Sequence, residues 1–283
     1  MKKILLPTDF SENSWNAIKY ALQLFKNKTC KFYLLNTYTP VIYHVEYVLV
    51  EPSQFDMGDT VRENSVTQLN NFKTKIEKEF NNSKHTIETI AAFNNLISEI
   101  KDLVKEKAID YVVMGTKGAT GIKEVLFGSN TVHVFKNVKC PILAIPDGFT
   151  FETPHEVLFP TDYQIDYKDY HIKPILDIIS PHSTRVNVLH ATYGYDLSEE
   201  QEKNKKTLEK YFEKSAHLFQ SVSNQTVEQG ISSFQLKTPI NLLVMINNKH
   251  SFFQNLFFKD TIKHIGFHLN IPFLVIPSKT NKT

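Results

Sequence analysis

The chain has 283 residues, a formal net charge of +2 and 22% charged residues. This length predicts about two domains, and the composition is that of an ordinary soluble globular protein. The balanced charge argues against a dedicated nucleic-acid binder, no apolar run is long enough for a membrane span, and Cys30 and Cys140 are expected to be core residues. The start MKKILLPTDF reads as a strand and not as a signal peptide, so we expect a cytoplasmic protein.

The first half alternates short apolar runs with segments of helical periodicity, which predicts a parallel sheet covered by helices. Strands are expected at 3–6, 32–36, 86–91, 111–114 and 140–145. Helices are expected over 11–26, 60–81, 96–106 and 130–139, the first of them capped by Ser11. A long connection over about 38–59 contains the helix breakers Pro40, Pro52 and Gly58.

The pattern then starts again. LLPTDF at 5–10 recurs as LFPTDY at 158–163, VVMGTKG at 112–118 as LVMINNK at 243–249, and CPILAIP at 140–146 as IPFLVIP at 271–277. Such repetition predicts two related domains, over residues 1–147 and 154–283. The offset falls from 153 to 131 along the repeat, so the second copy is 22 residues shorter. We expect the loss in the long connection and in the helix before the fourth strand, of which only about 231–237 would remain.

The segment from Asp110 to Pro146 reads strand, glycine loop, helix, strand, and four of the nine glycines of the chain fall between Gly115 and Gly128. Glycine is costly where nothing requires it, so this crowding indicates close approach of the backbone to a ligand. Gly128 and Ser129 open a helix, where unpaired N–H groups and the helix dipole favour an anion. The alternative is that the glycines are simple turns and that Ser129 only caps the helix.

Gly115-x-x-Gly118, nine residues and then Gly128-Ser129 resembles the nucleotide-binding signature of the universal stress protein family, and VVMGTKG, CPILAIP and PTDFS resemble that family as well. The resemblance implies two tandem Rossmann-like α/β domains of the adenine nucleotide alpha hydrolase type, each a five-stranded parallel sheet with flanking helices. It implies binding of ATP or AMP, with or without Mg²⁺, frequent dimer formation and a link to stress survival, but no defined reaction. The glycine pattern and the resemblance together predict these nucleotide-binding residues: Pro7, Thr8, Asp9, Thr37, Met114, Gly115, Thr116, Gly118, Gly128, Ser129 and Asn130.

Within this set the resemblance places Pro7, Thr8 and Asp9 at the base pocket. Asp9 follows the first strand, and open α/β sheets bind ligands at the carboxyl ends of their strands. Its carboxylate could accept hydrogen bonds from the adenine amino group or a ribose hydroxyl, and the alternative is a helix-start acid beside Ser11. Thr37 resembles a base-contacting position of the family, and Met114 and Thr116 are expected to line the pocket.

The second copy lacks the glycines. Ile246, Lys249, Lys259 and Asp260 stand where the first copy has Gly115, Gly118, Gly128 and Ser129. A branched side chain and a carboxylate oppose phosphate binding, so we predict one adenine nucleotide per chain, in the N-terminal copy. The two fifth strands, 140–145 and 271–276, should pair antiparallel and make an intrachain pseudo-dimer, because an exposed apolar edge strand needs a partner. A homodimer of the whole chain stays open.

No catalytic constellation and no metal motif is found in the sequence. His264 and His268 are four apart, without supporting acids, and are read as surface histidines, and Lys117 and Lys123 beside the glycine loop are read as solvated. We therefore expect a nucleotide-binding sensor or regulator. The alternatives are a slow ATPase or phosphotransferase, for which Asp9 is the only obvious acid, and an interaction protein that binds no nucleotide.

Overall fold

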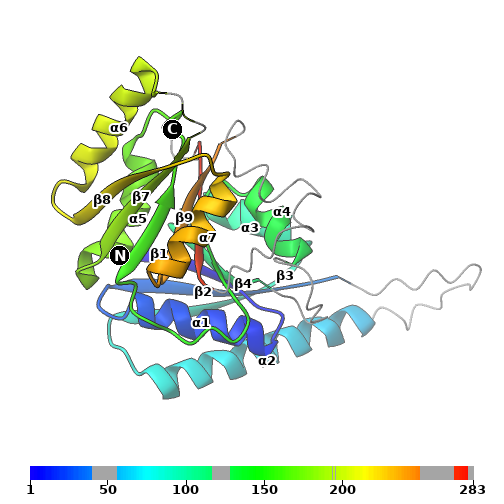
Figure 1. Cartoon of the computed structure of the whole chain (residues 1–283). Coiled ribbons are helices and arrows are strands. Elements are labelled where there is room, and N and C mark those ends of the chain that lie inside the picture. The colour runs from blue at the N-terminus through cyan, green and yellow to red at the C-terminus, as the bar shows by residue number, and fades with distance from the viewer. Residues whose placement is uncertain (40–55, 117–127, 193, 195, 249–270, 280–283) are drawn as a thin grey trace, which may run out of the picture.

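The computed structural model describes residues 1–39, 56–116, 128–192, 194, 196–248 and 271–279 (Figure 1). The first half consists of β1 (Lys2–Pro7), α1 (Glu12–Leu24), β2 (Cys30–Tyr38), α2 (Asp56–Phe80), β3 (His85–Phe93), α3 (Leu96–Glu106), β4 (Tyr111–Gly115), α4 (Ser129–Asn137) and β5 (Ile142–Ile145). The second half consists of β6 (Glu156–Pro160), α5 (Asp169–Ile179), the 3₁₀ helix η2 (Ser180–His182), β7 (Arg185–Thr192), α6 (Glu199–Phe212), β8 (Ala216–Ser223), α7 (Val227–Lys237), β9 (Leu242–Asn247) and β10 (Phe273–Pro277).

These strands form one ten-stranded sheet in the order β3-β2-β1-β4-β5-β10-β9-β6-β7-β8. Neighbouring strands are parallel within each half. The halves meet where β5 and β10 pair antiparallel, with Leu143 opposite Leu274. The predicted pairing of the two fifth strands is therefore confirmed, and each half covers an apolar edge of the other.

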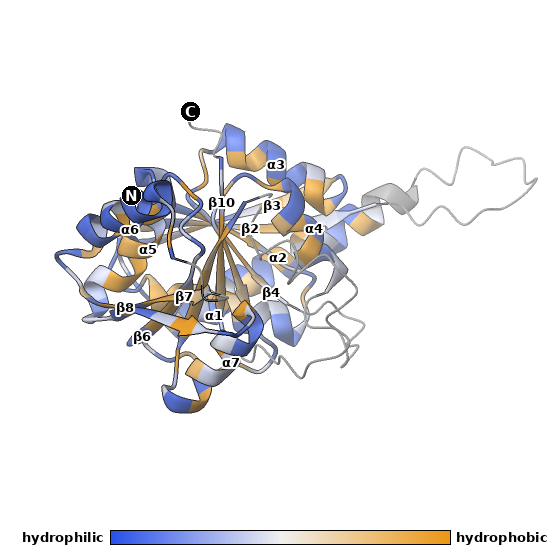
Figure 2. Cartoon of the chain, turned by 45° about the horizontal axis from the view of Figure 1, so that its top comes forward, coloured by the Kyte–Doolittle hydropathy of each residue, from blue (hydrophilic) through white to orange (hydrophobic). Residues whose placement is uncertain are grey.

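Helices cover both faces of this sheet. One core cluster joins α1, α2, α5 and α6 to one face, and a second joins α3, α4 and α7 to the other. Both clusters contain strand residues from both halves, so each core runs unbroken across the β5–β10 junction. Figure 2 shows the central strands as the most hydrophobic part of the molecule, as expected for a sheet buried on both faces. Cys30 and Cys140 are buried free thiols in these clusters, as predicted.

The second half also docks on the first through polar contacts at the amino ends of β1 and β4. Asp177 of α5 forms ion pairs with Lys2 and Lys28. The hydroxyl of Tyr111 donates to the carbonyl oxygen of Pro174, 3.1 Å away. These groups are largely shielded from water, so the halves are joined by more than one strand pair.

The shortening of the second half lies between its second and third strands and is shared by the long connection and the helix that follows it. α6 has 14 residues where α2 has 25, and from β8 onward the offset is already 131, since Ala216 corresponds to His85. The expectation of a shortened helix before the fourth strand is wrong, because α7 has 11 residues, as does α3. Thr226 caps α7 in a capping box with Gln229, which lets the helix begin four residues earlier than its apolar positions suggest.

Several other boundaries differ from expectation, among them the start of β10, which is Phe273 instead of Ile271. α2 begins at Asp56 and so includes Gly58, which was interpreted as a breaker. β5 begins at Ile142 instead of Cys140, after Pro141, whose missing N–H favours a position at a strand start. The helix expected over 96–106 has those bounds in the structure. No helix within the described ranges is both long enough and apolar enough to cross a membrane.

Candidate functional site

The turn after β1 is held by its own hydrogen bonds. The amide of Thr8 donates to the carbonyl oxygen of Leu35 over 2.8 Å, and Asn36 donates from its side chain to the carbonyl oxygen of Thr8. The Thr8 hydroxyl accepts from the amide of Phe10, which has a left-handed φ of 63°, and also bonds to the hydroxyl of Ser14. Thr8 is buried and its polar groups are engaged, so it shapes the turn that follows Pro7.

Asp9 is exposed at this turn. Its Oδ1 accepts from both the amide and the hydroxyl of Ser11, and Ser11 in turn caps α1 by accepting from the amide of Ser14. The cap predicted at Ser11 is confirmed. The carboxylate of Asp9 thus supports the helix start, while its second oxygen has no hydrogen-bond partner among the residues that the structure describes.

The end of β4 lies beside β1, which pairs with it in parallel. Met114 is buried toward α3 and α4, and Thr116 is anchored by its amide to the carbonyl oxygen of Ile145 over 3.0 Å. Gly115 faces α1, and a Cβ atom at this position would lie 1.8 Å from Oδ1 of Asn13. Any larger residue here would force the Asn13 side chain of α1 to move, whereas the sequence suggested that the space was left for a ligand.

Asn13 is the residue that sequence reasoning missed. Its side chain is 6% exposed, and neither its Oδ1 nor its Nδ2 has a hydrogen-bond partner in the described part of the chain. An unpaired buried polar group costs about 1–3 kcal/mol. A polar residue in the first turn of a helix gives no sign in the sequence that it will be buried, so nothing pointed to this contact with Gly115.

α4 begins beside this strand end. Gly128 is the N-cap residue and has no side chain to cap the helix, so the alternative that Ser129 only caps the helix is wrong, since Ser129 occupies the first helical position. The amide of Gly128 donates to the carbonyl oxygen of Thr116. The hydroxyl of Thr131 donates to the carbonyl oxygen of Gly115 over 3.1 Å. Ser129 and Asn130 are exposed. The helix start is thereby fixed against the end of β4, with its first-turn amides uncapped by any described side chain.

The remaining predicted residues fall elsewhere. Thr37 is a half-buried residue near the end of β2, opposite Ala92 of β3 and beyond the last residue of β1 in register. Several residues discussed above lie outside the described residues: Gly118, Lys117, Lys123, Lys249, Lys259, Asp260, His264 and His268. Within the described ranges no group of three or more His, Cys, Asp or Glu side chains is placed to hold a metal ion.

The second half keeps the turn but changes what surrounds it. The amide of Thr161 donates to Leu189, the amide of Tyr163 donates to the Thr161 hydroxyl, and Tyr163 has a φ of 56°. Ile246, buried with 4% exposure, stands where β4 has Gly115. Burial raises the pKa of Asp162 above its usual value.

In the second half the turn is also closed by α6. The Gln201 side chain donates to the carbonyl oxygen of Asp162 over 2.8 Å, and Asn204 donates to that of Tyr163 over 2.9 Å. The corresponding carbonyls of Asp9 and Phe10 accept no hydrogen bond from a described side chain. The two strand-end turns therefore share a backbone shape, and α6 has tied down only the second.

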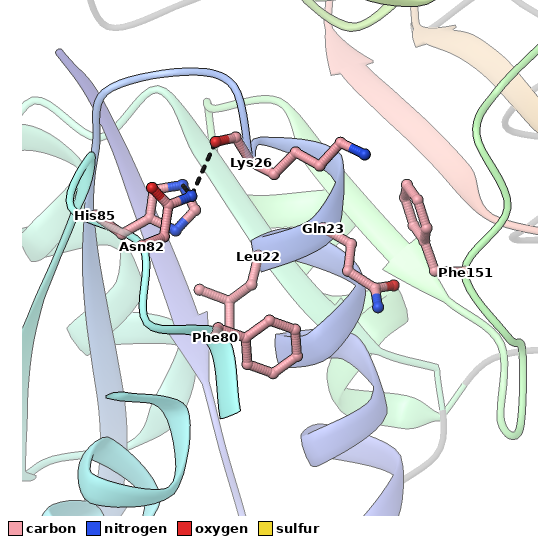
Figure 3. Close-up of a pocket in the computed structure, with 7 residues that line it drawn as sticks. All are labelled: Leu22, Gln23, Lys26, Phe80, Asn82, His85 and Phe151. Atoms are coloured by element: carbon pink, nitrogen blue, oxygen red, sulfur yellow. Dashed lines mark hydrogen bonds between the residues drawn. The ribbon is translucent and has the colours of Figure 1, made fainter. Parts of the chain in front are cut away.

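A cavity of about 340 Å³ lies away from these residues (Figure 3). It is lined by Leu22, Gln23, Lys26, Phe80, Asn82, His85 and Phe151. These residues come from the C-terminal ends of α1 and α2, the start of β3 and the link between the halves. The cavity is therefore at the amino ends of the strands, opposite the predicted nucleotide site.

Comparison with known proteins gives the context of this arrangement. A family model described as "Universal stress protein family" matches residues 1–146. A universal stress protein of Methanocaldococcus jannaschii is 31% identical over 146 residues, which cover 51% of this chain and 81% of that protein. A second universal stress protein of the same organism is 29% identical over 156 residues, covering 51% of this chain and 94% of that protein.

Two solved structures resemble the whole chain. A universal stress protein from Archaeoglobus fulgidus aligns over 99% of this chain and 97% of its own, with a TM-score of 0.66 and 15% identity. A protein of unknown function from Pseudomonas aeruginosa aligns over 98% and 92%, with a TM-score of 0.55 and 12% identity. At these identities the likeness concerns the fold, and it extends over both halves.

Proposed function

This chain belongs to the universal stress protein family, and we propose that its N-terminal half binds one adenine nucleotide, ATP or AMP, at the carboxyl ends of β1 and β4. Open α/β sheets bind ligands where the strand order reverses. In the order β3-β2-β1-β4-β5 that point lies between β1 and β4. The turn after Pro7, the end of β4 and the start of α4 all meet there.

The observation that carries the proposal is the start of α4. Gly128 caps this helix without a side chain, and the hydrogen bond from its amide to Thr116 holds the uncapped first turn at the end of β4. Free N–H groups and the positive end of the helix dipole suit a phosphate group. Ser129 and Asn130 are exposed at this helix start, and in this proposal their hydroxyl and amide groups would add hydrogen bonds.

The base and ribose would lie nearer β1 and β2. The free oxygen of Asp9 can accept a hydrogen bond from a ribose hydroxyl or an adenine amino group, and Thr37 lies on the neighbouring strand. Thr8 and Gly115 would contribute indirectly. Thr8 shapes the turn after β1, and Gly115 leaves room for the Asn13 side chain against β4. Met114 and Thr116 would line the same end of β4.

The second half would have no such site, so the nucleotide would bind once per chain. Ile246 fills the position of Gly115, and α6 occupies the carbonyls of the turn. In this proposal residues 1–147 form the binding domain and residues 154–283 a domain that has lost the site and covers the β5 edge of the first.

We further propose that the bound state acts as a regulatory signal in the stress response of the cell. Chemistry on the nucleotide has less support. Asp9 is the one carboxylate among the predicted site residues, and its Oδ1 already accepts hydrogen bonds from Ser11. Mg²⁺ bound with ATP keeps most of its ligands from phosphate and water, so a single carboxylate is compatible with it. Cytoplasmic location stays a prediction of the sequence.

The direct test is to release and identify whatever nucleotide the purified full-length chain carries, by mass spectrometry, and to titrate the stripped protein with ATP, AMP and GTP by calorimetry. We expect an adenine nucleotide and saturable binding of ATP or AMP. Failure of both nucleotides to bind would refute the proposal and favour the nucleotide-free interaction protein. Release of ADP and phosphate after incubation with ATP and magnesium would favour the ATPase alternative.

A further inference from the structure

The cavity at the amino ends of the strands has the features of a second binding site. Figure 3 shows Asn82 and His85 on one side of Leu22, and Gln23 and Phe151 on the other. Its volume of about 340 Å³ lies within the range of small-molecule sites, roughly 300–1,000 Å³. Because it is at the opposite end of α1 from Asp9, its ligand would not be the proposed nucleotide.

The walls of this cavity are largely apolar. Leu22 is buried in the core of the first half, and the half-buried ring of Phe80 packs against the same core. Phe151 is held edge-on against Tyr20, with 5.1 Å between ring centroids. Two phenyl rings and a leucine favour a flat aromatic body, which can stack or pack edge-on against the rings.

Two hydrogen-bond acceptors in this lining have no donor. Nε2 of His85 lies 3.1 Å from the carbonyl oxygen of Phe25 and 3.4 Å from Nδ2 of Asn82. The shorter contact is to a carbonyl, which can only accept, so we assign the hydrogen to Nε2, which makes Nδ1 an acceptor in the neutral ring. Burial lowers the pKa of His85, which favours this neutral form. Nδ1 of His85 and Oε1 of Gln23 are both buried without a partner in the described part of the chain. A ligand with O–H or N–H groups would satisfy them.

A positive charge without an acidic partner stands at the rim. Lys26 is exposed and forms no ion pair with the described residues, whereas nearby Lys28 is paired with Asp177. Lys84, on the same edge, points its ammonium group to the carbonyl oxygen of Asn27. Lys26 is therefore the cation of the lining that is available to an anionic ligand group.

We propose that this cavity binds a small aromatic acid that carries ring hydroxyl or N–H donors. The ring would lie among Leu22, Phe80 and Phe151, its donors would reach Gln23 and His85, and its carboxylate would lie near Lys26. Protocatechuate, a benzoate with two adjacent hydroxyl groups, has all three features and serves as the probe.

The test is a calorimetric titration of the full-length chain, saturated with ATP, against three probes. Protocatechuate should bind with a Kd of roughly 1 mM or better. Benzoate, which lacks the donors, should bind about tenfold more weakly, as the loss of one to two hydrogen bonds predicts. The methyl ester of protocatechuate, which lacks the charge, should also bind more weakly than the acid.

Substitutions in the cavity lining test which residues cause the preference for ring donors and for the carboxylate. Gln23→Leu keeps the volume and should shrink the advantage of protocatechuate over benzoate, while Lys26→Met should remove the advantage of the acid over its ester. Lys84→Met, a lysine of the same edge outside the cavity lining, is the matched control and should change neither. The proposal is overturned if protocatechuate does not bind, if ATP displaces it, or if Gln23→Leu and Lys26→Met both bind it like the unaltered chain.

Discussion

The two halves of the chain end their first strands in the same turn and differ in what lies around it. Thr8 and Thr161 each accept from the amide two residues on, and Phe10 and Tyr163 each take a left-handed φ. The strands that lie beside these turns in the sheet, β4 and β9, differ between the halves. β4 ends in a glycine packed against Asn13, and β9 carries the buried side chain of Ile246 at the matching position.

This difference separates the features that serve the fold in both halves from those that would serve nucleotide binding in the first half. Because the Pro-Thr-Asp turn is kept in the half that has lost the glycines, the turn by itself is a structural device of the fold. Among the described residues, the first half is distinguished by the glycine end of β4 and the open carbonyls of Asp9 and Phe10. The uncapped start of α4 at Gly128 adds to these, and its counterpart in the second half lies outside the described residues. Changes that make the first half resemble the second should therefore remove binding while leaving the fold.

The largest effect is expected from Gly115→Ile, which copies the residue of the second half. Its Cβ would meet Oδ1 of Asn13 at 1.8 Å, so we expect ATP binding to fall below detection and stability to fall by about 1–3 kcal/mol, as for other overpacked cores. Calorimetry and urea unfolding measure the two effects.

Asn13→Ala supplies the control for that clash. Gly115→Ala should destabilise the unaltered chain and cost clearly less in the Asn13→Ala background, because the small side chain leaves room for the new methyl group. Equal costs in the two backgrounds would show that the Asn13 contact does not explain the glycine.

Gly128→Asp should come next, with a loss of ATP affinity of roughly 100-fold or more, about 2.7 kcal/mol. The new carboxylate would stand where phosphate is proposed to bind, yet aspartate is a good N-cap, so thermal stability should hold or rise. Gly128→Asn is the matched variant, with equal bulk and no charge, and should retain more affinity. An unchanged ATP affinity of the Gly128→Asp variant would show that the phosphate does not bind at this helix start.

A milder loss is expected for Ser129→Ala. Removing one hydrogen bond to a charged phosphate should weaken ATP binding by tenfold to a hundredfold, roughly 1.5–3 kcal/mol. Because Ser129 is exposed and is not the helix cap, urea unfolding should be nearly unchanged. A substantial drop in stability instead would indicate a structural role that the hydrogen bonds do not show.

The smallest effects compare the two aspartates. Asp9→Asn should weaken ATP binding by a few-fold, about 1 kcal/mol, through its contact with the base or ribose. Asp162→Asn should leave binding unchanged, as should substitutions of Asp260, because the second half is proposed to have no site. Equal weakening of ATP binding by Asp162→Asn and Asp9→Asn in the titration would contradict this expected difference between the two aspartates.

Much of the fold could be predicted because its signals are local or repeated. The apolar strands, the helix over 96–106 and the pairing of β5 with β10 followed from periodicity and from the internal repeat. The full length of α7 was missed because its first turn is polar and is defined by the Thr226 capping box instead of by apolar spacing. Helix boundaries depend on such caps more than on hydrophobic pattern.

The arrangement of elements around the candidate site was predictable, but the packing that explains it was not. Sequence spacing brought the ends of β1 and β4 and the start of α4 together, but it treated Gly115 as space for a ligand, and the structure fills that space with Asn13. Which way a polar side chain in the first turn of a helix points is decided by packing between distant elements. The cavity beside Gln23 and His85 was missed for the same reason, since its lining comes from four separate segments.

The central claim is that only the first half binds nucleotide, and the stoichiometry of ATP binding tests it most directly. Calorimetric titration of the full-length chain, with protein concentration fixed by amino-acid analysis, should give one ATP or AMP per chain. Two equivalent sites per chain would contradict the account, because the half with Ile246 at its strand end would then bind as well as the half with Gly115.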